Sequence, residues 1–196
     1  MYSREHRAFH EAGHAVMAFL LGRKVEHISI IEDLDGRIFG VHHSLGRADV
    51  EPVLKQWITS FSKDVPRSEQ EYEELNDELV GLVREEVMVG VAGAAAIHNF
   101  SEDLGHHPLD GDCREYLDAY KLIEAISELE MSPVEFIKTV TEEAIELLYE
   151  NREAVEAIAD ALMEQEALSG HEAKQLFLAA TSPDEISVKA EARNPK

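Results

Sequence analysis

The chain has 196 residues, of which 44% are hydrophobic, and it is long enough to bury a substantial core within one domain. Its 18 Lys and Arg residues and 40 Asp and Glu residues give a formal net charge of −22, which repels a phosphate backbone and an anionic membrane surface. We therefore expect neither nucleic acids nor membranes as partners. The single cysteine, Cys113, can form no internal disulfide and no thiolate cage, so any metal must be held by histidines and carboxylates.

The N-terminal part predicts a helix followed by a β-hairpin. Apolar residues recur at helical spacing over residues 3–22 and predict an amphipathic helix that ends near Gly22. The apolar stretch at 15–21 falls far short of the roughly 20 residues that span a bilayer, so we expect a cytoplasmic chain. Residues 25–31 and 38–42 are rich in β-forming residues and flank an Asp-Gly turn, which predicts two antiparallel strands.

The middle of the chain predicts three further helices. Residues 50–61 follow the i, i+3, i+4, i+7 rule and predict a helix inside an inserted segment at 45–67. A long helix is expected over 68–99, acidic at first and then apolar and small, so that its second half should be buried. Residues 100–111 are typical of a loop, and another helix should run from 112 to about 130.

The C-terminal part contains two helix starts in which a capping serine is followed three residues later by a glutamate. These starts are Ser132 with Glu135 and Ser169 with Glu172. Residues 151–168 predict a further helix between them. Residues 181–196 contain two prolines and no periodic apolar face, so we expect one domain over 1–180 and a flexible tail after it.

The first predicted helix contains an H-E-x-x-H motif, formed by His10, Glu11 and His14. Histidines four residues apart on a helix lie one above the other, so their imidazoles can bind one Zn²⁺ ion. The glutamate beside the first histidine can take a proton from a water that attacks a carbonyl and return it to the leaving amine. The small residues Ala12 and Gly13 would let another element approach the helix closely, and the helical glycine calls for a packing reason.

Several segments in the same order resemble the peptidase domain of FtsH-type ATP-dependent zinc metalloproteases. They are His-Glu-Ala-Gly-His-Ala at 10–15, Val-Glu-His-Ile-Ser-Ile at 25–30, the strand at 36–41, Gly-Val-Ala-Gly-Ala-Ala-Ala at 90–96, Asn-Arg-Glu at 151–153 and Leu-Ser-Gly at 168–170. The resemblance implies a mostly helical, zincin-like α+β domain with a short hairpin beside the motif helix. It also implies zinc as the cofactor and hydrolysis of peptides or unfolded proteins.

The resemblance implies as third zinc ligand an aspartate at a helix start after a glycine-rich loop, and Asp112 is the matching residue. From the residues alone, Asp112 can instead be a helix cap completed by Glu115. Other candidates for the third ligand are Asp103, His106, His107 and Asp110.

A zincin cleft holds its substrate as an extended strand, which we expect to pair with the predicted edge strand. The residues expected to bind substrate there are Ile38, Phe39, Gly40 and Val41.

The chain also departs from the family pattern. Ala94, Ile97 and His98 stand where the family has an arginine and two glutamates. The family places a membrane anchor and an ATPase module before the motif, and the 196 residues contain no G-x-x-x-x-G-K-[ST] loop. The expected activity is therefore independent of ATP. An alternative is a catalytically silent interaction or regulatory module that partners a true ATP-dependent protease. A homo-oligomer and a separate ATPase partner both stay open.

Overall fold

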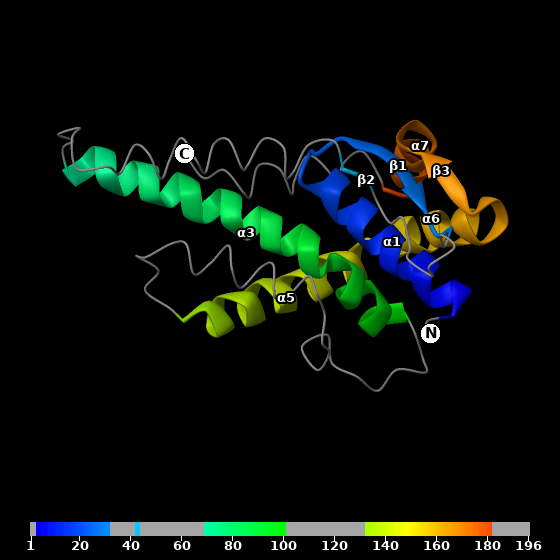
Figure 1. The fold of residues 1–196 in the computed structure, drawn as a ribbon, viewed down its shortest axis with the longest axis horizontal. Coiled ribbons are helices and arrows are strands. Elements are labelled where there is room, and N and C mark those ends of the chain that lie inside the picture. Colours follow the sequence, from blue (N-terminus) through cyan, green and yellow to red (C-terminus); the bar gives the residue numbers. More distant parts are fainter. Residues whose placement is uncertain (1–2, 32–41, 44–68, 101–131, 182–196) are drawn as a thin grey trace.

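The computed structural model describes residues 3–31, 42–43, 69–100 and 132–181, and these residues form a mostly helical α+β arrangement. In chain order, the elements are α1 (Arg4–Leu20), β1 (Val25–Ser29), β2 (His42–His43), α3 (Glu69–Phe100), α5 (Pro133–Glu150), α6 (Arg152–Gln165), β3 (Ala167–Ser169) and α7 (Gly170–Ala180). Figure 1 shows α1 in the middle of the molecule, with α3 and α6 on different sides of it.

Helix α1 is the central element of the core. It begins at Ser3, whose side chain accepts a hydrogen bond from the amide of His6, and it ends before Gly22, which has a φ of 73°. The prediction of an amphipathic helix was wrong for its second half, because every residue from Glu11 to Phe19 is buried. The reason is that α3, α6 and β1 all pack against this helix.

The three strands form one antiparallel sheet in the order β2-β1-β3. The predicted antiparallel pairing of the first two strands is confirmed, with Val25 opposite His43 and His27 opposite His42. The third strand was not predicted. The helix expected over 151–168 ends at Gln165, Glu166 takes a left-handed conformation with a φ of 63°, and the next three residues pair with β1.

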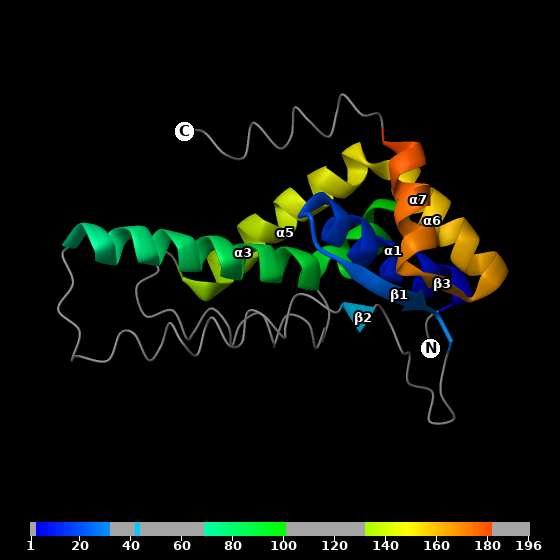
Figure 2. The same cartoon turned by 90° about the horizontal axis from the view of Figure 1, so that it is seen from above.

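Helix α3 confirms the long helix expected over 68–99. It packs side by side with α5. As predicted, the apolar second half of α3 is buried, including Val83, Val87 and Val91. Arg84 on α3 also pairs with Glu143 on α5. Figure 2 shows the N-terminal half of α3 extending well beyond the end of α1.

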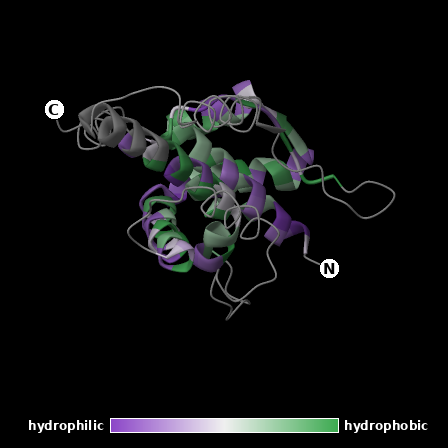
Figure 3. Ribbon diagram, turned by 60° about the vertical axis from the view of Figure 1, so that its left-hand side comes forward, coloured by the Kyte–Doolittle hydropathy of each residue, from purple (hydrophilic) through white to green (hydrophobic). Residues whose placement is uncertain are grey.

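The last helices start as the sequence predicts. Ser132 and Glu135 form a complete capping box at α5, and Ser169 and Glu172 form one at α7. Both hydrophobic and hydrophilic residues lie on the helices that meet around the core (Figure 3). In the part of the chain that the structure describes, no helix is both long enough and apolar enough to cross a membrane.

Several predictions fall outside the described residues. They concern the hairpin turn, the inserted segment at 45–67 with its helix, most of the loop at 100–111, the helix from 112 to about 130, and the tail from 182 onward. Thr181, the first residue of the expected tail, is buried, and its hydroxyl donates a hydrogen bond to the carbonyl of Phe177.

Candidate functional site

His10 and His14 lie one turn apart on α1 with their rings in contact. Their Nε2 atoms are 3.1 Å apart, and the two rings meet edge to face with centroids separated by 4.6 Å. Two imidazole nitrogens bound at about 2.0–2.1 Å to one tetrahedral zinc ion would lie roughly 3.3 Å apart. The observed spacing therefore fits two ligands of a single metal ion.

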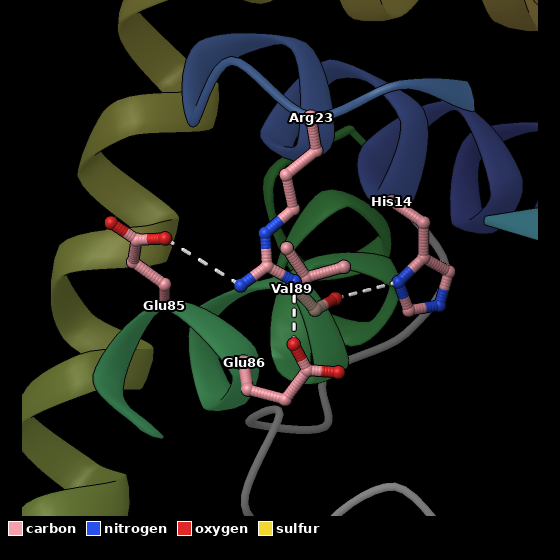
Figure 4. A network of polar contacts seen from close by, with 5 residues as sticks. All are labelled: His14, Arg23, Glu85, Glu86 and Val89. Atoms are coloured by element: carbon pink, nitrogen blue, oxygen red, sulfur yellow. Dashed lines mark hydrogen bonds and ion pairs between the residues drawn. The ribbon is translucent and has the colours of Figure 1, made fainter. Parts of the chain in front are cut away.

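A main-chain carbonyl of α3 fixes which nitrogen of a neutral His14 ring carries the proton. His14 Nδ1 lies 2.8 Å from the oxygen of Val89 (Figure 4). A carbonyl oxygen can only accept a hydrogen bond, so Nδ1 must carry the proton, and Nε2 of the neutral ring keeps its lone pair. Histidine ligands of metals are commonly oriented in this way by a partner on the other ring nitrogen.

Two glycines bring α1 and α3 unusually close to each other. A Cβ atom on Gly13 would lie 2.5 Å from the carbonyl oxygen of Ala92 and from the Cβ of Ala96. A Cβ atom on Gly93 would lie 2.5 Å from Nε2 of His14 and from Cε1 of His10. This close contact with α3 explains why a glycine stands at position 13 inside the helix. It also places the backbone of α3 directly beside both imidazoles.

Arg23 joins the segment after α1 to the same part of α3. Its guanidinium lies 2.6 Å from Oε2 of Glu86 and 3.6 Å from Oε2 of Glu85. The Arg23 and Glu86 side chains are only 11% and 17% exposed, so this ion pair is shielded from solvent, whereas Glu85 is 45% exposed. Figure 4 shows that both glutamates lie on the stretch of α3 that also presents Val89 to His14.

Glu11, the glutamate of the motif, is also buried. It is 5% exposed, close to the 8% of His14, whereas His10 is half-buried. A carboxylate at this depth is uncommon unless it is paired or functional. The motif thus buries the Glu11 carboxylate and the His14 imidazole and leaves the His10 imidazole partly exposed.

The remaining predicted site residues lie outside the part of the chain that the structure describes. Asp112, the predicted third ligand, lies outside the described residues, as do the alternative ligands Asp103, His106, His107 and Asp110. The predicted substrate-binding residues Ile38, Phe39, Gly40 and Val41 lie outside them as well. Within the described ranges, no group of three or more His, Cys, Asp or Glu side chains is arranged to hold a metal ion.

No family model and no curated protein matched this chain. The resemblance to FtsH-type peptidases therefore rests on the motifs of the sequence.

The sequence reasoning missed the contributions of α3 to the site. Residues 90–96 resemble a family motif, but that motif does not indicate Val89 as the partner of His14 or Gly93 as the neighbour of both rings. The one signal was glycine inside a predicted helix, where it is unfavourable unless close packing requires it. This signal does not separate Gly93, which lies against both rings, from Gly90, where an added Cβ atom would meet nothing within 4 Å.

Proposed function

We propose that this chain is a zinc-dependent peptidase of the zincin-like class, which hydrolyses peptides or unfolded proteins without ATP. The observation that carries the proposal is the 3.1 Å spacing of His10 Nε2 and His14 Nε2 on a helix that also buries Glu11. His10, His14 and Asp112 would hold the metal. Bound there, zinc would polarise the substrate carbonyl and acidify a water molecule.

Glu11 would act as the general base and then as the general acid. Its carboxylate takes a proton from the attacking water while the water oxygen bonds to the substrate carbonyl carbon. The same carboxyl group then gives that proton to the amide nitrogen as the C–N bond breaks, so Glu11 ends the reaction ionised. Burial of Glu11 supports this role, because few solvent molecules compete for the proton at a site from which bulk water is excluded.

The hydrogen bond to Val89 keeps His14 ready to bind the metal. With the proton held on Nδ1, the lone pair of Nε2 points away from the carbonyl of Val89. The ring needs no change of tautomer before it becomes a ligand. A ligand oriented in advance costs less conformational entropy when the metal binds.

The zincin-like class is supported by the position of the sheet as well as by the motif. Strand β1 packs against the motif helix α1 and pairs with β2, the end of the predicted edge strand. An extended substrate added beside β2 would continue the sheet whose strand β1 packs against α1.

The test compares the wild-type chain with Glu11→Gln and with Glu5→Gln, an exposed glutamate in the first turn of the same helix. We expect the wild-type chain to hold about one zinc per molecule and to cleave an unfolded protein. Glu11→Gln should keep the zinc and lose roughly 10²- to 10⁴-fold of the rate, the usual contribution of a general base. Glu5→Gln should keep both the zinc and the rate. Full activity in Glu11→Gln would contradict the role of Glu11.

ATP independence is tested with a stably folded substrate and its unfolded counterpart, each with and without ATP. We expect cleavage of the unfolded form alone, unchanged by ATP, because the 196 residues contain no phosphate-binding loop. Cleavage of the folded form, or stimulation by ATP, would contradict this expectation. A zinc-loaded chain that cleaves neither form would favour the interaction or regulatory module.

A further inference from the structure

Helix α3 contains three glycines in very different surroundings. A Cβ atom added at Gly81 or Gly90 would meet nothing within 4 Å. A Cβ atom added at Gly93 would lie 2.5 Å from Cε1 of His10, 2.5 Å from Nε2 of His14 and 2.6 Å from Nδ1 of His10. Non-bonded carbon and nitrogen atoms do not approach so closely, so an alanine at position 93 requires the rings or the helices to move.

All three of the nearest atoms at Gly93 belong to the two imidazoles. The His14 ring cannot turn away at low cost, because it is 8% exposed and its Nδ1 proton is bonded to the oxygen of Val89. In an α-helix the carbonyl of residue 89 also pairs with the amide of residue 93, so the hydrogen-bond acceptor and the bare backbone beside the ring belong to one turn. This turn of α3 therefore sets where both rings can lie.

Close helix packing alone does not explain Gly93. Gly13 already allows the two backbones to approach, because it is the residue that faces the carbonyl of Ala92 and the Cβ of Ala96. Gly93 instead faces side chains, and both side chains belong to the H-E-x-x-H motif.

We propose that Gly93 is a positioning residue for metal binding: its missing side chain leaves the space in which the His10 and His14 rings bring their Nε2 atoms together. This inference rests on the proposed metal role of the two histidines. It assigns to α3 a direct part in the geometry of the site, although α3 supplies no metal ligand of its own within the described residues.

The test pairs Gly93→Ala with Gly90→Ala, which makes the same change one turn earlier on the same helix. Each variant is titrated with Co²⁺, whose visible absorption reports the geometry of its ligands, and then with Zn²⁺ in competition. We expect Gly90→Ala to match the wild-type chain. Gly93→Ala should weaken metal binding by about 10- to 100-fold, the range found when groups that orient metal ligands are lost, and should alter the Co²⁺ spectrum.

A second measurement uses the metal-free protein and covers the case in which Gly93→Ala folds poorly. Unfolding by denaturant is compared for Gly93→Ala in the wild-type background and in a background carrying both His10→Ala and His14→Ala. If Gly93 makes room for the imidazoles, the alanine should destabilise the wild-type chain and be tolerated once both rings are absent.

The outcomes separate this inference from the proposed function. A wild-type chain that binds neither Co²⁺ nor Zn²⁺ overturns the proposed function and with it the metal role of Gly93. Metal binding by the wild-type chain with equal affinity in both glycine variants overturns the inference alone. Equal destabilisation by Gly93→Ala in both backgrounds also overturns it, because Gly93 would then serve helix packing only.

Discussion

Gly13 lies directly against the main chain of Ala92, so closely that a Cβ atom at position 13 would be 2.5 Å from the Ala92 carbonyl oxygen. Gly13 stands between His10 and His14 in the motif. Ala92 directly precedes Gly93, the glycine that lies beside both histidine rings. The contact is the closest approach of α1 to the backbone of α3 among the glycine contacts of the described residues.

Gly13→Ala should lower the free energy of unfolding by about 1–3 kcal/mol, because the new methyl group meets a backbone oxygen that cannot turn aside. The higher helix propensity of alanine offsets only part of this cost. Gly81→Ala is the control, since a Cβ atom at position 81 meets nothing within 4 Å. There the gain in helix propensity of about 0.5–1 kcal/mol should appear without any steric cost. Denaturant unfolding of both variants measures the difference, and equal stabilisation by the two would contradict the close contact.

A double-mutant cycle on Arg23 and Glu86 should give a coupling energy of about 1.5–3 kcal/mol, as expected for a charged hydrogen bond shielded from water. The control cycle is Arg152 with Glu156, which has the same 2.6 Å N–O distance on a solvent-exposed helix surface. That pair should couple by only about 0.3–0.5 kcal/mol. Similar coupling in the two cycles would show that burial does not strengthen the Arg23 pair.

Asp112→Ala should reduce the zinc retained after dialysis far more than Asp110→Ala or His106→Ala. The reason is that a site with two imidazoles needs a third protein ligand to hold zinc firmly, and Asp112 is the residue that the family resemblance implies. Elemental analysis of the dialysed proteins measures the metal content. Wild-type zinc content in Asp112→Ala would remove this residue from the metal site.

The capping box at α7 should make stability depend on pH in acid. Hydrogen bonds from the side chain and then the backbone of Ser169 hold the pKa of Glu172 below its ordinary value. A carboxyl group with a lowered pKa in the folded state stabilises the fold above its unfolded pKa, roughly 4.3, and loses that contribution as the pH falls through the folded value. The stability difference between the wild-type chain and Glu172→Gln should therefore be largest near neutral pH and shrink in acid.

Chemical denaturation at a series of pH values measures this difference. In a Ser169→Ala background the same substitution should have a smaller pH-dependent effect, because the hydroxyl that contributes most to the lowered pKa is gone. A difference that does not change with pH would contradict the role of the ionised carboxylate.

Features that depend on residues within a few positions of one another could be predicted from the amino-acid sequence. The capping boxes at Ser132 and Ser169 each join a serine to a glutamate three residues later, and both were predicted correctly. The same holds for the spacing of His10 and His14, because one helical turn brings them together wherever the helix lies. The burial of the second half of α3 could be predicted because its residues from 87 to 97 are all apolar or small.

The surroundings of the H-E-x-x-H motif come from residues far away in the chain and could not be predicted. His14 meets the carbonyl of Val89 from 75 residues away, and Arg23 meets Glu86 across 63 residues. β3 was missed because a three-residue strand has no periodicity of its own and exists through its pairing with β1. The second half of α1 is buried on all sides for a similar reason, because α3 and α6, which are distant from it in the chain, pack against it together with β1. Contacts of this kind depend on which helices pack together, and that choice is made by the free energy of the whole core rather than by local preference.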